Sequence, residues 1–339
     1  MSRMKVVVLD DYQQVALDCA DWSRLGADVS TLTRHVDDHD ELVEELRDAD
    51  VVVVMRERTP IPAGLLDRLP NLRLLVTTAP YNKSIDMAAA TERGVTVCGT
   101  RGSKLSTAEH TWGLILAMLR DVPGEQESLR SGDWQRGLGT TLHGKTLGLL
   151  GLGTVGAQMA RVARAFEMDV LAWSPNLTAV RAKECGATLV GKEELLGTSD
   201  VVSVHLVLGP RSRNLISRAE LALMHPRAYL VNTSRGPIVD TAALTDALRD
   251  GTIAGAAVDV FDVEPIPPGH PLLSTPHTLL TPHIGYVTVE DYRLFFGDVV
   301  EDIAAWAAGA PIRVVNDPRP DGPLPAHSET GEPRGPTPH

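Results

Sequence analysis

Short apolar runs rich in β-branched residues alternate with amphipathic stretches along most of the chain. In the first hundred residues, four such runs predict buried strands of a parallel sheet. They lie at residues 5–9, 51–55, 72–77 and 95–98. Amphipathic stretches at residues 40–46 and 86–93 predict helices between them. The alternation is typical of an α/β fold in which helices cover a doubly wound parallel sheet.

A second series of apolar runs predicts a second parallel sheet. Its strands are expected at residues 146–150, 170–173, 201–204, 229–231, 256–258 and 278–280. Long helical patterns at residues 106–120 and 287–308 separate the two series, and the first opens on Ser106 and Glu109, which have the spacing of a capping box. We therefore expect one domain from residues 1–103 and 287–315, a second from residues 104–286, and a catalytic cleft between them.

The amino-acid composition argues against several kinds of partner, location and site. The 32 basic and 44 acidic residues give a net charge of −12, which argues against a nucleic-acid partner. No window approaches about 18 consecutive apolar residues, so we expect no membrane span, and the amino terminus does not resemble a secretory signal. Three scattered cysteines (Cys19, Cys98 and Cys185) are too few for a disulfide framework or a zinc site, so we expect a reducing cytoplasm.

The last 24 residues, 316–339, change in character. Seven of them are proline, mixed with glycine, serine and acidic residues, and none of the pattern is periodic. This composition predicts a disordered, proline-rich tail.

A glycine-rich turn follows the apolar run at residues 146–150 and opens a helical pattern. Gly151 permits a tight turn, Gly153 lets the backbone approach a pyrophosphate, and Gly156 lets the helix pack on the strand. Phosphates would lie at the helix N-terminus, where backbone amides are free and the helix dipole favours anions. The alternative is that the glycines serve only a tight turn. The predicted phosphate contacts are Gly151, Gly153, Thr154, Val155 and Gly156.

The end of the next strand bears on the choice between NAD and NADP. A carboxylate is expected about 20 residues beyond the glycines, where it would bind the ribose hydroxyls. Here the strand ends instead in Ser174, Pro175 and Asn176. Without a carboxylate nothing repels a 2′-phosphate, and Arg181 or Lys183 could reach one, so we favour NADP. The alternative, in which Ser174 and Asn176 bind the plain ribose of NAD, stays open.

Three polar residues each follow a predicted strand. They are Arg235, Glu264 and His283, and the carboxyl ends of parallel strands form the edge at which such sheets build sites. Removing hydride from a 2-hydroxy acid requires a base for the hydroxyl proton, and the reverse requires an acid. Histidine suits both tasks because its ordinary pKa is about 6.5. Glu264 would pair with the imidazolium and fix the ring, and Arg235 would offer its planar fork to a substrate carboxylate.

Five motifs occur in a specific order: Ser106-Thr-Ala-Glu109, Gly151-Leu-Gly-Thr-Val-Gly156, Asn232-Thr-Ser-Arg-Gly236, Asp259-Val-Phe with Glu264-Pro265, and His270-Pro-Leu-Leu leading to Thr281-Pro-His283. With them the chain resembles the D-isomer-specific 2-hydroxyacid dehydrogenases over residues 5–315. This NAD(P)-dependent family includes glyoxylate/hydroxypyruvate reductases and phosphoglycerate dehydrogenases.

The resemblance implies a flavodoxin-like substrate domain, a Rossmann dinucleotide-binding domain, and a homodimer. It also implies that Arg235 binds substrate, that His283 is the acid/base and that Glu264 supports it. Asp259 would contact the nicotinamide carboxamide, and Thr233 and Gly285 would join it among the cofactor contacts.

One loop departs from the family pattern. The family has a glycine-bearing loop whose amides hold the substrate carboxylate, but here Ala79 replaces a glycine and Pro80 has no N–H to donate. Tyr81 and Lys83 could instead contact a distal anionic group. The candidate substrate contacts are therefore Ala79, Pro80, Tyr81, Arg235 and His283.

We therefore expect a cytoplasmic NAD(P)-dependent reductase that converts small 2-oxo acids into D-hydroxy acids. Two alternatives stay open. The altered loop would suit a dehydrogenase for another small anion, such as phosphite or a phosphonate-bearing acid. A dinucleotide-sensing binding protein without turnover is the other, although the intact Arg235, Glu264 and His283 argue against it.

We assign no metal site. The run Asp37-Asp38-His39-Asp40 is better explained as a helix cap and acidic first turn. His270 and His277 flank prolines and have no ligand partners at a useful spacing.

Overall fold

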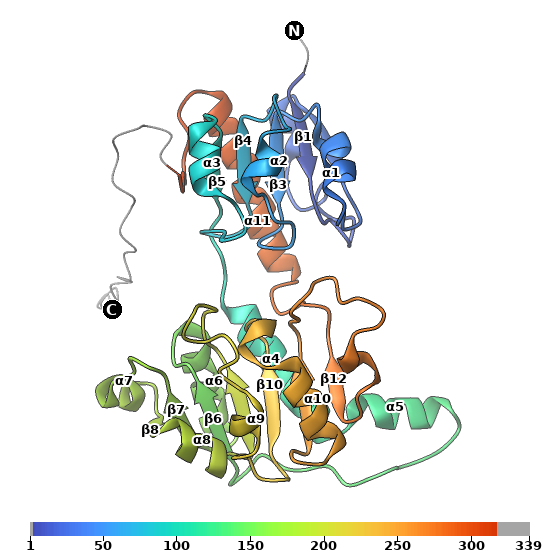
Figure 1. Cartoon of the computed structure of the whole chain (residues 1–339), viewed down its shortest axis with the longest axis vertical. Helices are drawn as coiled ribbons and strands as arrows, with labels where there is room; N and C mark the ends of the chain where they lie inside the picture. The colour runs from blue at the N-terminus through green and yellow to red at the C-terminus, as the bar shows by residue number, and fades with distance from the viewer. Residues whose placement is uncertain (1–2, 317–339) are drawn as a thin grey trace, which may run out of the picture. The chain divides into compact units, whose positions relative to one another are not determined.

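The computed structural model describes residues 3–316 and divides into two compact units (Figure 1). The first unit comprises Met1–Gly102 and the part of the chain that begins at Val289, and the second comprises Ser103–Thr288. These boundaries lie one and two residues from those expected from the sequence. The expected α/β fold with two parallel sheets is confirmed.

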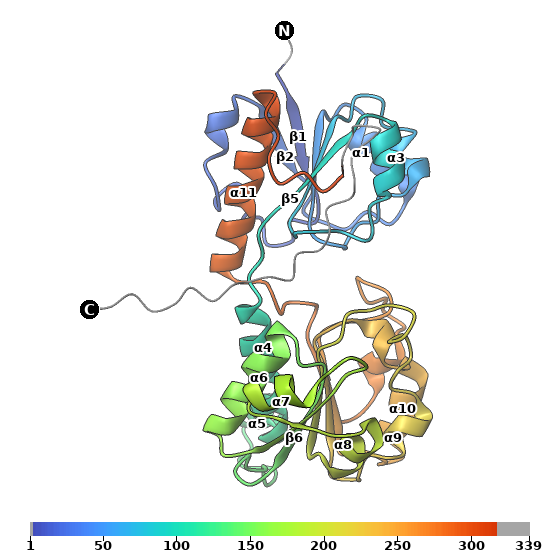
Figure 2. The ribbon, with the colours of Figure 1, turned by 90° about the vertical axis from the view of Figure 1, so that its left-hand side faces the viewer.

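The first unit is built on a five-stranded sheet in the order β2-β1-β3-β4-β5, in which all neighbours are parallel. Its strands are β1 (Lys5–Val8), β2 (Asp28–Thr31), β3 (Val51–Val54), β4 (Leu74–Thr77) and β5 (Thr96–Gly99). The last three are buried at every position. Figure 2 shows why: α1 (His39–Leu46) and α3 (Met87–Glu92) cover one face, and α11 (Val289–Ala307) covers the other.

Side-chain caps fix the starts of two helices in this unit. The carboxylate of Asp38 accepts hydrogen bonds from the amides of Asp40 and Glu41 at the start of α1. Asp86 does the same for the amide of Ala89 in α3. The acidic run before α1 is therefore a helix cap, as expected. Within residues 3–316, no group of three or more His, Cys, Asp or Glu side chains is arranged to hold a metal ion.

Asn316 is not the first residue of a disordered tail, and the prediction was wrong at this position. Its side chain is buried, and its amide oxygen accepts from the Val97 amide at 2.6 Å. Its nitrogen donates to the Val95 carbonyl at 2.9 Å and to Thr91 Oγ1 at 3.1 Å. These bonds fasten the chain to the edge strand β5. The rest of the predicted tail, residues 317–339, lies outside the described residues.

The second unit is built on a seven-stranded parallel sheet in the order β12-β11-β10-β9-β6-β7-β8. The strands are β6 (Thr146–Leu150), β7 (Asp169–Trp173), β8 (Thr188–Leu189), β9 (Val201–Val204), β10 (Tyr229–Asn232), β11 (Gly255–Val258) and β12 (Thr278–Leu280). From β6 the chain first builds outward through β7 and β8, then returns to the other side of β6 with β9. The strand order therefore reverses between β6 and β9, and open α/β sheets bind ligands beyond the carboxyl ends of the strands at such a point.

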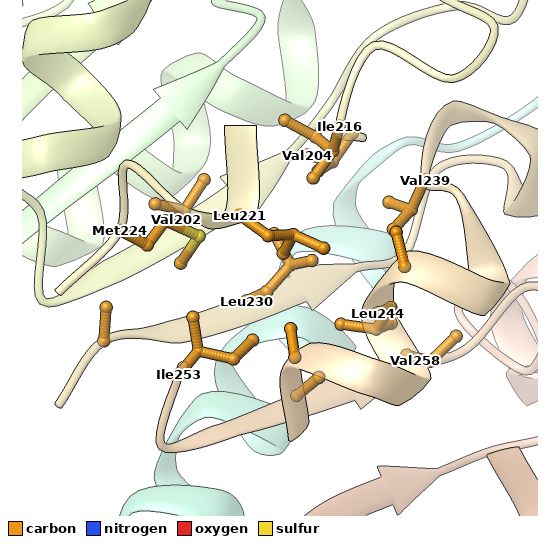
Figure 3. Close-up of a cluster of buried hydrophobic side chains, with 14 of the residues drawn as sticks. Val202, Val204, Ile216, Leu221, Met224, Leu230, Val239, Leu244, Ile253 and Val258 are labelled. Atoms are coloured by element: carbon orange, nitrogen blue, oxygen red, sulfur yellow. The ribbon is translucent and has the colours of Figure 1, made fainter. Parts of the chain in front are cut away.

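Helices cover both faces of this sheet. On one face lie α8 (Lys192–Thr198), α9 (Arg218–Leu221) and α10 (Thr241–Arg249), whose apolar side chains pack with those of β9, β10 and β11 in the cluster of Figure 3. On the other face, α6 (Thr154–Ala165) packs against β6 and β7, and α4 (Leu105–Leu119) packs against β10 and β11. Burial on both faces explains why these strands are continuous apolar runs. The remaining helices are α2 (Ala63–Leu66), α5 (Val122–Arg130) and α7 (Ala179–Glu184).

The capping box expected at Ser106 and Glu109 is absent. Helix α4 begins at Leu105, with Lys104 in the cap position and no side-chain cap. Ser106 therefore lies inside the first turn and is buried, whereas a capping residue must precede the first helical residue. A capping box does form at α9, between Ser217 and Glu220.

None of the helices within residues 3–316 combines the length and the apolar character needed to cross a membrane.

Candidate functional site

The glycine turn joins β6 to α6 in a geometry that only glycine permits at two positions. Gly151 has φ +105°, in the region that L side chains rarely adopt, and a Cβ there would lie closer than 3.0 Å to the carbonyl oxygen of His205. A Cβ at Gly156 would lie closer than 3.0 Å to the carbonyl oxygen of Gly151. Gly156 therefore allows α6 to pack directly on the turn, as the motif predicts.

Gly153 differs from its neighbours because a Cβ on it would meet nothing within 4 Å. It is the N-cap of α6 and provides no side-chain cap. The first helical hydrogen bond runs from the Ala157 amide to the Gly153 carbonyl at 2.9 Å, so the amides of Thr154, Val155 and Gly156 precede it. This open, uncapped N-terminus at the point where strand order reverses fits the pyrophosphate of a dinucleotide.

The end of β7 carries no carboxylate. Ser174 is half-buried, Pro175 and Asn176 are exposed, and the Leu177 amide donates to the Ser174 carbonyl at 3.1 Å to close the turn. Arg181 lies on α7, half exposed, with its guanidinium 3.6 Å from the carboxylate of Glu184. These contacts leave the Arg181 guanidinium near the surface in a weak ion pair.

Arg235 follows β10 in a turn held by Asn232. The Asn232 side chain accepts from the Ser234 amide at 3.1 Å and donates to the Arg235 carbonyl at 3.0 Å. The half-buried Arg235 guanidinium donates to the Ser234 carbonyl at 2.8 Å. A Cβ at Gly236 would lie closer than 3.0 Å to the backbone of Phe261, so only glycine lets these two strand ends approach.

Glu264 and His283, which are 19 residues apart, form a hydrogen-bonded pair. Glu264 Oε2 lies 2.5 Å from His283 Nδ1, and Oε1 accepts from the Phe261 amide at 2.8 Å. Their side chains are 25% and 18% exposed. Because Nδ1 is engaged by Glu264, Nε2 is the ring nitrogen left for other partners. The Tyr286 ring meets the imidazole edge-on at 5.5 Å between centroids.

Arg235, Glu264 and His283 follow β10, β11 and β12, which are neighbours in the sheet. All three therefore lie at the carboxyl edge of the second unit's sheet, on one side of the strand-order reversal. The sequence predicted each strand end separately, and the strand order places them next to one another.

Asp259 is the most connected carboxylate of this edge and only 1% exposed. Its Oδ1 accepts from Thr281 Oγ1 at 2.6 Å and from the Ile284 amide at 2.9 Å, and its Oδ2 accepts from the Gly285 amide at 3.0 Å. His110 Nε2 lies 3.3 Å from Oδ1. Burial acts to raise the pKa of Asp259, but the hydrogen bonds from His110, Thr281 and Ile284 outweigh it and lower that pKa below its usual value.

His110, which directly follows the motif Ser106-Thr-Ala-Glu109 and which the sequence alone assigns to neither the site nor the helix packing, also lies at this edge. It lies on α4, four positions after the buried Ser106 and hence on the same face of the helix. A buried Ser106 would have indicated that His110 also faces the protein interior. Because Ser106 was taken as a helix cap, which lies before the helix, it gave no indication of which helix face is buried.

The hydroxyl of Thr233 is buried and already committed. Thr111 Oγ1 donates its one hydrogen to the Thr107 carbonyl at 2.6 Å, so the 2.8 Å bond between Thr111 and Thr233 must use the hydrogen of Thr233. Toward any further partner, the Thr233 hydroxyl therefore offers only lone pairs.

The candidate residues Ala79, Pro80 and Tyr81 follow β4 in the first unit. Ala79 is buried and its carbonyl accepts from the Thr100 amide at 3.0 Å, whereas Pro80 is exposed and Tyr81 is 46% exposed. The loop is shaped by Asn82, which sequence reasoning passed over. The buried Asn82 side chain donates to Thr77 Oγ1 at 3.0 Å and accepts from the Ser84 amide at 2.8 Å.

Comparison with known proteins gives a consistent result. Residues 112–285 match the family described as D-isomer specific 2-hydroxyacid dehydrogenase, NAD binding domain. The chain is 39% identical over 290 residues to the glyoxylate reductase of Aeropyrum pernix, covering 82% of this chain and 86% of that protein. It is 36% identical over 314 residues to the D-3-phosphoglycerate dehydrogenase of Archaeoglobus fulgidus, covering 91% of this chain and 58% of that protein.

Among solved structures, a phosphoglycerate oxidoreductase from Vibrio cholerae superposes with a TM-score of 0.87 at 37% identity. The alignment covers 91% of this chain and 100% of that chain. The chain spans only 51–58% of the length of two curated phosphoglycerate dehydrogenases that it matches. The match to the dinucleotide-binding domain, the relatives and the glycine turn agree with the resemblance noted from the motifs, and the chain belongs to the D-isomer specific 2-hydroxyacid dehydrogenase family.

Proposed function

We propose that the protein is an NAD(P)-dependent oxidoreductase that transfers hydride between a nicotinamide dinucleotide and a small 2-oxo or 2-hydroxy acid, of D configuration in its reduced form. The observation that carries the proposal is the Glu264–His283 pair, which follows strands of the same sheet as the open glycine turn. The names of the relatives, glyoxylate reductase and phosphoglycerate dehydrogenase, support a small 2-oxo or 2-hydroxy acid as substrate.

The chain's own residues account for the proton and the carboxylate. The dinucleotide, when bound, supplies or takes up the hydride. Glu264 holds Nδ1 of His283, so Nε2 exchanges the proton with the substrate oxygen: it donates in reduction and accepts in oxidation. Glu264 stabilises the imidazolium that forms in oxidation. Arg235 binds the substrate carboxylate through its planar guanidinium. We also propose Ala79, Pro80 and Tyr81 as substrate contacts.

The test is a set of initial rates with NADPH and with NADH against glyoxylate, hydroxypyruvate, pyruvate and phenylpyruvate, with chiral analysis of the product. His283→Ala should lower kcat by about 10²–10⁴-fold, because the general acid is lost, while dinucleotide binding measured by fluorescence stays unchanged. Unchanged turnover in this variant would remove His283 from the mechanism and end the proposal.

We propose a preference for NADP. Its support is the half-buried Ser174 that follows β7, where a carboxylate would repel a 2′-phosphate, together with Arg181 and Lys183, the cations of α7. Ser174→Asp should raise the KM for NADPH by about 10-fold or more while that for NADH stays the same or falls. A wild-type enzyme that prefers NADH, or a variant that treats NADPH as before, would contradict the preference.

We propose a homodimer that uses α5 and the segment after it. Leu129 is 60% exposed, Trp134 is 74% exposed and Leu138 is fully exposed, which is unusual for large apolar side chains close together in a chain. Figure 1 shows α5 standing apart from the sheet of its own unit. Light scattering should give twice the chain mass, and Trp134→Ser with Leu138→Ser should give a monomer. A monomeric wild type would exclude this assembly.

We propose the cytoplasm as the location of the protein. The free thiols of Cys19, Cys98 and Cys185 support this location.

One departure favours a second candidate activity. Pro80 has no N–H to bind a carboxylate, and this supports oxidation of another small anion, such as phosphite or a phosphonate-bearing acid. Formation of NADH or NADPH with phosphite, in the absence of turnover of any 2-oxo acid, would select this activity. Dinucleotide binding without turnover of either class would instead favour a dinucleotide sensor.

A further inference from the structure

The ring of His110, on α4, contacts the strand ends that carry the acid–base histidine. Its Nε2 lies 3.1 Å from Thr281 Oγ1 and 3.3 Å from Asp259 Oδ1, and its side chain is 19% exposed. The proposed function assigns no task to His110, so its contacts need a separate explanation.

The segment that carries His283 is anchored on both sides by one carboxylate. Before His283, the Thr281 hydroxyl donates to Asp259 at 2.6 Å, and after it the amides of Ile284 and Gly285 donate at 2.9 and 3.0 Å. Between these anchors His283 has φ +53°, a left-handed conformation that is uncommon for residues other than glycine. The direction of the His283 ring therefore depends on Asp259.

The number of hydroxyl hydrogens shows that His110 is the donor in its contact with Thr281. The single hydroxyl hydrogen of Thr281 is used in its 2.6 Å bond to Asp259. The contact between His110 Nε2 and Thr281 Oγ1 therefore requires Nε2 to carry the hydrogen and to donate it. His110 thus keeps the Thr281 hydroxyl turned toward Asp259 and brings a further donor to the same carboxylate oxygen.

We propose that His110 is a positioning residue for His283, acting through Thr281 and Asp259. It keeps the anchors of the segment in place, and so keeps Nδ1 of His283 on Glu264 and Nε2 directed at the substrate. This inference rests on the proposed function, because it takes His283 as the group that exchanges the proton. A misplacement of about 1 Å in such a group costs about 10²-fold in rate.

The kinetic test compares two replacements at His110 with a control. His110→Leu keeps much of the volume and removes the donor, whereas His110→Gln places an amide N–H near the position of Nε2. The control is His143→Leu, since His143 is a 76% exposed surface histidine of the same unit. We expect kcat to fall about 10- to 100-fold in His110→Leu with the KM for the acid within about twofold, to recover largely in His110→Gln, and to stay unchanged in the control. A kcat within twofold of wild type in His110→Leu, or equal losses in both His110 variants, would overturn the inference.

A spectroscopic test separates this inference from the proposed function. In protein labelled with ¹⁵N-histidine, the hydrogen between His283 Nδ1 and Glu264 should give a low-field proton signal that Glu264→Gln abolishes. We expect the signal to persist in His110→Gln and to broaden or vanish in His110→Leu. A signal unchanged in His110→Leu refutes the positioning role. If the signal depends on His110 in this way but the wild-type protein turns over no 2-oxo or 2-hydroxy acid, the positioning role is supported and the proposed function is refuted.

Discussion

The carboxyl group of Asp302 on α11 makes a quantitative prediction about pH and stability. Its side chain is fully buried; Oδ1 accepts from Arg313 Nε at 2.9 Å, whereas Oδ2 has no hydrogen-bond partner within residues 3–316. Burial raises the pKa of Asp302 to about 7, although Arg313 acts to lower it, and the nearby carboxylates of Asp298 and Glu301 add to the rise. The native protein therefore binds this proton more tightly than the unfolded chain does.

The sign and size of the effect follow from linkage. The stabilisation is fully present below the unfolded pKa, near 3.8, and is lost as the pH rises through the folded pKa, near 7. A difference of about three pH units at about 1.4 kcal/mol each gives about 4 kcal/mol in total. Between pH 5 and pH 8 the free energy of unfolding should fall by about 2.5 kcal/mol through this group alone.

Asp302→Asn tests this because an amide keeps an acceptor for Arg313 and does not titrate. The free energy of unfolding of wild type and variant is measured by urea unfolding at pH 5, 6, 7 and 8. Plotted against pH, the two free energies should converge or cross, because between pH 5 and pH 8 the variant gains about 2.5 kcal/mol of stability relative to wild type. Glu290→Gln is the matched control on the same helix, since Glu290 is exposed in the first turn of α11 and does not contribute to the Asp302 pKa, so it should leave the pH dependence unchanged. Parallel curves for Asp302→Asn and wild type would refute the reasoning.

Other variants test the site and the chain end. Gly153→Ala should fold with wild-type stability, because a Cβ there meets nothing within 4 Å, yet it should lose dinucleotide affinity in calorimetry. Gly156→Ala should lose dinucleotide affinity and also unfold at a lower temperature, because its Cβ would meet the Gly151 carbonyl. Equal stability of the two variants would contradict the packing argument. Glu264→Gln should lower kcat by about 10- to 100-fold in steady-state assays, with dinucleotide binding retained, because the imidazolium loses its counter-charge. Asn316→Ala should cost about 1–3 kcal/mol in urea unfolding, because it leaves the Val97 amide unpaired, and no loss would show that the chain end is not fastened there.

The sequence predicted the buried strands well and missed two strands that lie at the sheet edges, β2 and β8, although it predicted the edge strands β5 and β12. Strands β3, β6 and β9 are continuous apolar runs because helices cover both of their faces. Strand β2 lies at the edge of its sheet and alternates between exposed and half-buried positions, and β8 has only two residues. Neither leaves a run long or apolar enough to be recognised, so both were missed.

The site shows a similar division. Arg235, Glu264 and His283 could be proposed because each chemically distinctive residue follows a predicted strand. Their adjacency depends on the order of strands in the sheet, which local patterns do not contain. His110 could not be assigned, because a histidine one residue after the supposed capping box of Ser106 and Glu109 gives no information on which strand ends its helix face meets.

The distribution of tasks along the second unit's sheet has a consequence for how this protein can change. The glycine turn follows β6 and the proposed ribose contacts follow β7, whereas Arg235 and the proposed acid–base pair, Glu264 and His283, follow β10, β11 and β12, across the strand-order reversal. Substitutions that alter dinucleotide choice and substitutions that alter proton transfer therefore fall on different segments with few shared neighbours, and their effects should add. Evolution could therefore change the preferred dinucleotide without altering the residues proposed for proton transfer. The segments after β6 and β7 and those after β10, β11 and β12 could likewise be optimised in separate mutant libraries.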